Sequence, residues 1–281
     1  MQMTVSPQGA ACGALVNGID LKRELDADQV AAIRAAWLAH QVLVFAGQDL
    51  SLDELARFAS TIGPFGVDPY FGNVPGHPHI AQVRRDADEK TKIFAETWHS
   101  DWSFLPSPPQ ATVLYGNVIP PVGGDTLFAN QYAAWDALSP AMQALLRDRQ
   151  GIHSARRGYA RDGMYGERDK GRSMAIKYDD SALATQTHPI ARVHPETGRT
   201  ALFVSPGYTI GNEGMDEREA QALLMELFGH QVRDDFVYRH RWQPGMLVLW
   251  DNRCVVHAAT GGYQGHARLL HRITLAERAA A

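Results

Sequence analysis

The chain has 281 residues, of which 45% are hydrophobic, and a formal net charge of −4 at pH 7. This length and hydrophobic content suffice for one large core, so we expect a single domain over residues 1–281. The slightly acidic balance predicts no general attraction to nucleic acid or to an anionic membrane.

The cysteine content and the start of the chain bear on the compartment. The two cysteines, Cys12 and Cys254, are far apart in sequence, and two cysteines in a chain of this size do not form a disulfide framework. Residues 1–4 lack the basic and apolar regions of a signal peptide. No apolar run reaches the roughly 18 residues needed to span a bilayer. We therefore expect a cytoplasmic protein.

The first third of the chain predicts two helices among short strands. Asp26 is a candidate N-cap for a helix through about residue 39, because apolar residues recur behind it at helical spacing. Ser51 and Glu54 form a capping box for a second helix, which we expect to run to Ile62. Residues 65–76 are rich in glycine, proline and aromatic residues and predict a loop. The strands predicted in this part span residues 13–19, 41–45 and 79–83.

The rest of the chain predicts mainly strands. Ser139-Pro140 starts a helix in which Met142, Leu145 and Leu146 share one side, and another helix lies near residues 216–229. Residues 155–187 have no periodic apolar face and predict a long loop or lid. The predicted strands span residues 111–118, 126–129, 188–194, 201–204, 235–241, 246–257 and 267–275. Many short strands between Gly/Pro turns indicate a mainly β fold with flanking helices, either a sandwich or a jelly roll.

The sequence Trp98-His99-Ser100-Asp101 places an imidazole and a carboxylate two positions apart. Side chains alternate along a strand, so His99 and Asp101 would point the same way and could reach one metal ion together. A His-x-Asp pattern occurs often by chance, and a site needs a third ligand. Residues 247–257 contain two apolar runs that frame a polar turn, and His257, which closes the second run, is the candidate. Two histidines and one carboxylate that leave other positions open form the facial triad of non-haem Fe(II) oxygenases.

Two arginines follow His257 in the stretch Arg268-Leu269-Leu270-His271-Arg272. Their even spacing on a strand would put Arg268 and Arg272 on one face, with His271 facing away. A buried arginine near the metal would bind the far carboxylate of a 2-oxo acid through two parallel hydrogen bonds.

These motifs, in this order, resemble the Fe(II)/2-oxoglutarate-dependent dioxygenases, in particular the group of the taurine and 2,4-dichlorophenoxyacetate dioxygenases (TauD/TfdA). The likeness covers nearly the whole chain and is carried by residues 41–45, 98–101, 123–126, 250–252 and 268–272. It implies a double-stranded β-helix, a cupin-like jelly-roll core with helices outside. It also implies that His99, Asp101 and His257 form the catalytic centre and bind Fe(II), with 2-oxoglutarate as co-substrate and O₂ as oxidant.

The resemblance assigns three residues beyond the metal ligands. Arg268 is expected to pair with the C5 carboxylate of 2-oxoglutarate, and Thr126 to donate a hydrogen bond to the same group. Arg272 would bind the sulfonate or carboxylate of the prime substrate, which implies a small organic anion.

Three further residues are candidates for substrate contact. Tyr70 and Phe71 lie in the loop that covers the active site in the resembled family, and Ser154 is a candidate for the border of the pocket. The chain has Tyr70 where the taurine enzyme has a histidine, and it lacks an asparagine just before His99. This departure disfavours taurine itself, and together with Trp102 the aromatic loop favours a larger, more apolar or aromatic tail, as in aryloxyalkanoic acids.

The expected reaction is hydroxylation of a sulfonate, aryloxyalkanoate or similar acid next to its heteroatom, with succinate and CO₂ as co-products. Two alternatives use the same three ligands. A zinc-dependent hydrolase would give Arg268 no role and would need no O₂, and a non-catalytic cupin-like protein would bind substrate without forming succinate. The expected partner is a small anionic organic substrate, not nucleic acid or a membrane. Whether the chain forms a homo-oligomer, such as a dimer or tetramer, stays open.

Overall fold

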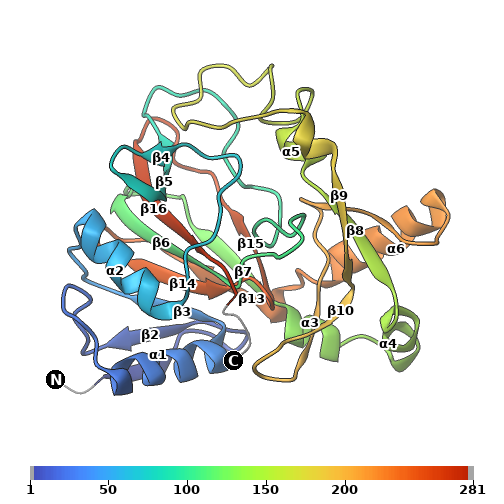
Figure 1. Cartoon of the computed structure of the whole chain (residues 1–281), viewed down its shortest axis with the longest axis horizontal. Coiled ribbons are helices and arrows are strands. Elements are labelled where there is room, and N and C mark those ends of the chain that lie inside the picture. Colours follow the sequence, from blue (N-terminus) through green and yellow to red (C-terminus); the bar gives the residue numbers. More distant parts are fainter. Residues whose placement is uncertain (1–2, 278–281) are drawn as a thin grey trace.

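The computed structural model describes residues 3–277, and its largest layer is an eight-stranded sheet. The strand order is β1-β2-β3-β14-β6-β16-β5-β4; β2 and β3 run parallel, and the other neighbouring pairs run antiparallel (Figure 1). The strands span Thr4–Pro7 (β1), Ala14–Asn17 (β2), Val42–Phe45 (β3), Leu247–Asp251 (β14), Ala111–Val118 (β6), Arg268–Leu275 (β16), His77–Arg85 (β5) and Asn73–Val74 (β4).

Three smaller sheets complete the β structure of the described residues. The first, in the order β13-β7-β15, consists of Val237–His240, Thr126–Asn130 and Val255–Ala259. The second, in the order β12-β8-β9, consists of Thr209–Asn212, Gln150–Ser154 and Thr185–Pro189. The third pairs β10 (Ala191–Val193) with β11 (Thr200–Leu202).

Helices lie outside these sheets (Figure 1). The two that cover the large sheet are α1 (Ala27–His40) and α2 (Leu52–Ile62). The others are α3 (Gln131–Asp136), α4 (Pro140–Leu146), α5 (Arg156–Tyr159) and α6 (Glu217–His230), with two 3₁₀ helices at Asp180–Leu183 (η1) and Asp234–Phe236 (η2). A mainly β fold with flanking helices is therefore confirmed.

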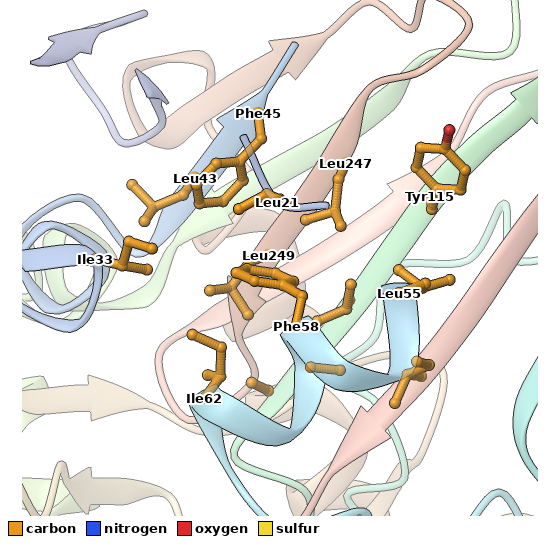
Figure 2. Packing of buried hydrophobic residues seen from close by; sticks show 14 of the residues in the cluster. Leu21, Ile33, Leu43, Phe45, Leu55, Phe58, Ile62, Tyr115, Leu247 and Leu249 are labelled. Atoms are coloured by element: carbon orange, nitrogen blue, oxygen red, sulfur yellow. The ribbon is translucent and has the colours of Figure 1, made fainter. Parts of the chain in front are cut away.

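Alternate residues of the large sheet point to opposite faces, and both faces are covered by other elements. On one face Leu43 and Phe45 of β3 pack with β6, β14 and β16 against α1 and α2. Figure 2 shows Phe58 and Ile62 of α2 reaching this face near Leu249. On the other face Val42 and Val44 pack toward the β13-β7-β15 sheet. Burial on both faces explains why residues 41–45 read as a continuous apolar run rather than an alternating one.

The predictions for the two N-terminal helices are confirmed together with their caps. Asp26 and Ser51 each accept a hydrogen bond from the backbone N–H of the third residue of their helix, and the side-chain oxygen of that residue accepts one from the backbone N–H of the cap. Two details further on are wrong: Leu145 is 43% exposed rather than facing the core, and helix α3 was not predicted. Residues 155–187 do form a largely irregular segment, but α5, η1 and the start of β9 lie within it.

The stretch 246–257 was predicted as a strand with a polar turn inside it; the turn is confirmed, but it separates two strands rather than interrupting one. The chain forms β14 up to Asp251, turns through residues 252–254 and returns as β15 in a different sheet. Arg253 helps to make the turn, because its backbone N–H and its guanidinium both donate to the carboxylate of Asp251. The turn carries the chain from the large sheet to the β13-β7-β15 sheet, which contains His257.

Among residues 3–277, no helix combines the length and the apolar character needed to cross a membrane.

Candidate active site

The first two candidate ligands do not lie on a strand, contrary to expectation. Only His99 is paired, in an isolated β-bridge to His257 of β15. Asp101 begins a turn, and Trp102 after it has a φ of 45°, in the left-handed region that few non-glycine residues adopt. A turn rather than strand alternation therefore brings Asp101 next to the histidine pair.

The three candidate metal ligands converge on one point. The Nε2 atoms of His99 and His257 lie 3.6 and 3.8 Å from Oδ1 of Asp101, and the two imidazole centroids are 4.2 Å apart. One ligand atom from each residue lies within 4.8 Å of the other two, and all three residues are buried. These separations suit atoms that share one ion, since each ligand would lie about 2 Å from it.

The protonation of these side chains also fits a divalent cation. Nδ1 of His99 lies 2.8 Å from the carbonyl of Thr97; a carbonyl only accepts, so Nδ1 carries the proton and Nε2 is free to coordinate. Burial lowers the pKa of His257 to about 3, and the neighbouring His99 acts in the same direction. Burial alone would raise the pKa of Asp101, but Arg272 and the two histidines outweigh it and hold that pKa well below its usual range. The donor set that these residues offer to a metal is thus two imidazole nitrogens and one carboxylate.

The second carboxylate oxygen of Asp101 is held by a chain of buried polar groups. The hydroxyl of Thr112, on β6, donates to Oδ2 at 2.6 Å. Nδ2 of Asn252 donates to the Thr112 hydroxyl at 3.0 Å, and the indole N–H of Trp250 donates to Oδ1 of Asn252 at 2.9 Å. The role of Thr112 was not predicted, and Asn252, in the polar turn of residues 247–257, was expected to do no more than form that turn.

Gly207 lies against the first histidine. Its N–H donates to the carbonyl of Trp98 at 3.1 Å, and a Cβ at this position would lie 2.9 Å from Cβ of His99. A residue with a side chain would therefore push the two segments apart. This role was not predicted, because a glycine that follows a proline reads as an ordinary turn.

Arg272 lies beside the metal ligands. Its Nη2 is 3.2 Å from Oδ1 of Asp101 and 3.5 Å from Oδ1 of Asp68. The guanidinium lies against the rings of both Phe71 and Trp102, at 5.0 and 4.8 Å from their centroids. Its buried Nε has no polar partner among the described residues. A buried, stacked guanidinium with a spare donor can bind an anionic group.

The aromatic loop residues support this arginine more than they line open space. Tyr70 stacks on Tyr159 with centroids 4.4 Å apart, and its hydroxyl lies 3.2 Å from Oγ of Ser181. Phe71 packs edge-on against Trp102. Both are buried, and neither is among the residues that line the cavity beside His99.

A cavity of about 100 Å³ opens beside His99. Its wall is mostly aromatic and apolar, with Phe94, Tyr159, Tyr165 and Tyr208 among the lining residues and Arg157 as the one charged side chain. Tyr208 stands edge-on to the His99 ring, with centroids 5.9 Å apart. Tyr159 and Tyr165 come from residues 155–187, so this segment forms a wall of the cavity, which agrees with the expected lid.

Arg268 lies at a second, smaller cavity together with Tyr263, Arg85 and Phe94, which also lines the cavity beside His99. Its Nη2 donates to the carbonyl of Gly124 at 3.1 Å, and its buried Nε has no polar partner among the described residues. A Cβ at position 124 would lie 3.3 Å from that Nε, which is a tight contact. The φ of Gly124, +69°, also favours glycine at this position.

Thr126 lies two residues beyond Gly124, at the start of β7. Its hydroxyl accepts the indole N–H of Trp242 at 2.9 Å, which leaves the hydroxyl hydrogen free to donate to an anion.

Ser154, at the end of β8, does not line the cavity beside His99. Its hydroxyl donates to the carbonyl of Ala182 at 2.9 Å and accepts the N–H of Arg156 at 3.3 Å. It ties η1 to the strand rather than facing open space.

A second cluster with metal-binding side chains consists of His194, Asp251 and Cys254, all buried. Both oxygens of Asp251 already accept from Arg253, and Oδ2 also lies 3.0 Å from Nε2 of His194. Burial raises the pKa of the Cys254 thiol well above its ordinary value, so the thiolate that a metal needs is disfavoured. This cluster stabilises the turn between β14 and β15.

Known proteins resemble the chain over nearly its full length. The sequence profile of the family described as "Taurine catabolism dioxygenase TauD, TfdA family" matches residues 4–274. An (S)-phenoxypropionate/alpha-ketoglutarate-dioxygenase of Delftia acidovorans is 35% identical over 269 residues, which cover 92% of this chain and 90% of that protein. An alpha-ketoglutarate-dependent sulfate ester dioxygenase of Pseudomonas putida is 32% identical, over 98% of this chain and 90% of that protein. The crystal structure of a taurine dioxygenase from Burkholderia xenovorans superposes with a TM-score of 0.82 at 33% identity, and covers 98% of this chain and 90% of that one.

Proposed function

Because the chain belongs to the TauD/TfdA family of dioxygenases, we propose that His99, Asp101 and His257 bind Fe(II) for the oxidation of a small organic acid. The chain is a 2-oxoglutarate-dependent non-haem iron dioxygenase. The observation that carries the ligand assignment is the approach of two imidazole Nε2 atoms to one carboxylate oxygen, at 3.6 and 3.8 Å. Family membership disfavours a zinc-dependent hydrolase and a non-catalytic binding protein.

The ligands leave room for the other reactants. When bound, Fe(II) with 2-oxoglutarate and O₂ supplies the oxidising power that converts a C–H bond of the substrate to C–OH, while 2-oxoglutarate leaves as succinate and CO₂. His99, Asp101 and His257 would hold the ion through three ligand atoms and would leave coordination positions for the 2-oxo acid and for O₂. Two neutral histidines and one carboxylate reduce the charge of a divalent ion to +1, which still attracts an anionic co-substrate.

We propose that Arg268 and Thr126 bind the C5 carboxylate of 2-oxoglutarate. Two features support this: the buried Nε of Arg268 has no polar partner among the described residues, and the Thr126 hydroxyl has its hydrogen free. Burial lowers the pKa of Arg268, so an anion that restores a full charge pair is favoured there.

Arg272 is the proposed anchor for the anionic group of the prime substrate. Its guanidinium lies against Phe71 and Trp102 and next to Asp101, so an acid bound to it would have its carbon chain near the metal. In this reading Tyr70 and Phe71 act mainly by holding the anchor in place.

The cavity beside His99 supports the class of substrate. An aromatic wall suits an aryl or apolar tail better than the short chain of taurine, because apolar and aromatic surfaces gain by burial together. Relatives named for phenoxypropionate and for sulfate esters act on acids of this kind. We therefore propose an aryloxyalkanoic acid or a similar organic anion, hydroxylated next to its heteroatom.

Three broader expectations are kept as proposals. The large sheet and the β13-β7-β15 sheet, which share a buried apolar layer, would form the two halves of a double-stranded β-helix. Residues 1–281 would form one domain, and the protein would act on its small acid substrate in the cytoplasm.

A panel of acids tests this proposal. Aryloxyalkanoates, alkyl sulfates, sulfonates including taurine, and simple carboxylates are each incubated with protein, Fe(II), 2-oxoglutarate and O₂, and succinate is measured. The proposal predicts that aryloxyalkanoates stimulate succinate formation more than taurine does. Stimulation by taurine alone would contradict the substrate class, and no stimulation by any anion would contradict the role of Arg272.

A further inference from the structure

The Asp101 carboxylate presents its two oxygens to different partners. Oδ1 faces the Nε2 atoms of His99 and His257, whereas Oδ2 accepts the hydroxyl of Thr112 at 2.6 Å. We propose that Thr112 is a positioning residue that restricts Asp101 to one metal-binding oxygen, and that Asn252 and Trp250 fix the direction of its hydrogen bond. This proposal rests on the metal site proposed above.

The direction of the hydrogen bonds follows from the donors and acceptors. The indole N–H of Trp250 can only donate, so the oxygen of the Asn252 side chain must face it, at 2.9 Å. The amide nitrogen of Asn252 then points to the hydroxyl of Thr112 and donates to it, at 3.0 Å. Because that hydroxyl is already accepting, its single hydrogen is directed to Oδ2 of Asp101. These three hydrogen bonds therefore form a relay in which every donor points the same way, from Trp250 through Asn252 and Thr112 to the carboxylate of Asp101.

The sheet builds this relay in place. Trp250 of β14 and Thr112 of β6 are direct partners in the antiparallel register, and Asn252 follows at the end of β14. Thr112, Asn252, Trp250 and Asp101 are all at most 2% exposed, so water does not compete for these hydrogen bonds. The Trp250 ring also packs on the His257 ring, with centroids 4.7 Å apart. The same tryptophan thus contacts one ligand directly and the other through the relay.

Restricting Asp101 to one oxygen has a chemical consequence. A carboxylate can bind a metal through one or both oxygens. A second bond from Asp101 would fill one of the positions that the 2-oxo acid and O₂ require. The hydrogen bond to Oδ2 makes that second bond unfavourable and also fixes the angle at which Oδ1 is presented. Partners of this kind are typically worth about 10- to 100-fold in metal affinity or activity.

Binding of Co(II) alone, followed by visible absorption under titration, tests this role without relying on turnover. Thr112→Val removes the hydroxyl at nearly constant volume, and Thr112→Ala removes it without directing a methyl group at the carboxylate. Thr112→Ser restores the hydroxyl. Tyr115→Phe is the matched control, because it also removes a buried hydroxyl from β6. That hydroxyl donates to the carbonyl of Gln48 and accepts the N–H of Leu50, so it does not contact Asp101.

The proposal predicts Co(II) affinity about 10- to 100-fold weaker in Thr112→Val and Thr112→Ala, and within about 3-fold of the unsubstituted chain in Thr112→Ser and Tyr115→Phe. Unchanged affinity in either of the first two variants, provided that it folds, would overturn it. Equal weakening in Tyr115→Phe would also overturn it, because the effect would then be one of general packing. If His257→Ala bound Co(II) as tightly as the unsubstituted chain, the metal site itself would be wrong and this role with it.

Discussion

The backbones of His99 and His257 bind each other directly. The N–H of His99 donates to the carbonyl of His257 at 3.0 Å, and the N–H of His257 donates to the carbonyl of His99 at 2.8 Å. Residues that pair in this way project their side chains to the same side of the backbone. One β-bridge between segments about 160 residues apart in sequence therefore brings the two imidazoles together, and the turn at Asp101 adds the carboxylate.

Loss of one imidazole should strongly weaken metal binding. Loss of a residue that only hydrogen-bonds to a metal ligand typically weakens metal binding about 10- to 100-fold. We expect His257→Ala, which removes a ligand itself, to weaken Co(II) binding by more than this. His271→Ala is the control, because His271 is also a buried histidine, contacts Gln82 and lies at an odd spacing from Arg272 on β16. Equal weakening in both variants would contradict the assignment of His257.

The two arginines of β16 should affect different reactants. Replacement of Arg272 by lysine keeps the charge but loses the planar donor group and its stacking on Phe71 and Trp102. We expect Arg272→Lys to raise KM for the organic acid by about 10- to 100-fold, the value of a hydrogen bond to a charged group, with little change in KM for 2-oxoglutarate. Arg268→Lys should show the reverse pattern. Steady-state kinetics with each reactant varied in turn would measure both, and a common effect on the two KM values would refute separate roles.

The close approach of Gly207 to His99 predicts a third effect. A Cβ at Gly207 would lie 2.9 Å from Cβ of His99, so Gly207→Ala should displace this ligand and lower both Co(II) affinity and succinate formation. Gly211→Ala is a suitable control, since a Cβ there would meet the Ile152 side chain at an ordinary 3.4 Å. If Gly207→Ala matched Gly211→Ala in both measurements, the contact would have no role in positioning His99.

Acid should destabilise the fold through buried neutral histidines. Burial lowers the pKa of His153 to about 3 and that of His240 to about 4, from an ordinary value of 6.5. Below pH 6.5 the unfolded chain binds these protons and the folded chain does not, so the stabilisation is complete above pH 6.5 and is lost as the pH falls toward these values. Each histidine should contribute a slope of about 1.4 kcal/mol per pH unit to the free energy of unfolding in this range.

His153→Gln isolates one of these contributions. Denaturant unfolding at several values between pH 4.5 and 6, with ~0.5-unit steps, should give a slope smaller by about one proton than that of the unsubstituted chain. An unchanged slope would mean that His153 is protonated in the folded state.

The sequence was sufficient to predict the candidate ligands, because that prediction depends only on residue types and on their order along the chain. His99, Asp101 and His257 were proposed together because the order of the motifs resembles a known family, and the structure brings the three side chains to one point. The local mechanism was wrong, however: a β-bridge and a turn, rather than one strand, align His99 with Asp101.

The supporting residues could not be predicted in the same way. Thr112 in a strand reads as an ordinary β-former, and its role depends on Asn252, 140 residues later in the chain. The polar turn between β14 and β15 could be predicted, but the change of sheet could not, since the contacts that hold the turn come from distant residues such as Glu196, which binds Arg253.

The most direct test of the account is a comparison of metals and oxygen in one assay. Protein freed of metal is supplied with Fe(II) or Zn(II), with and without O₂, in the presence of 2-oxoglutarate and an accepted aryloxyalkanoate, and succinate and the oxidised acid are quantified. The account predicts equal amounts of succinate and product with Fe(II) and O₂, and none when Zn(II) replaces Fe(II) or when O₂ or 2-oxoglutarate is omitted. Conversion of the acid with Zn(II) in the absence of O₂ would contradict it.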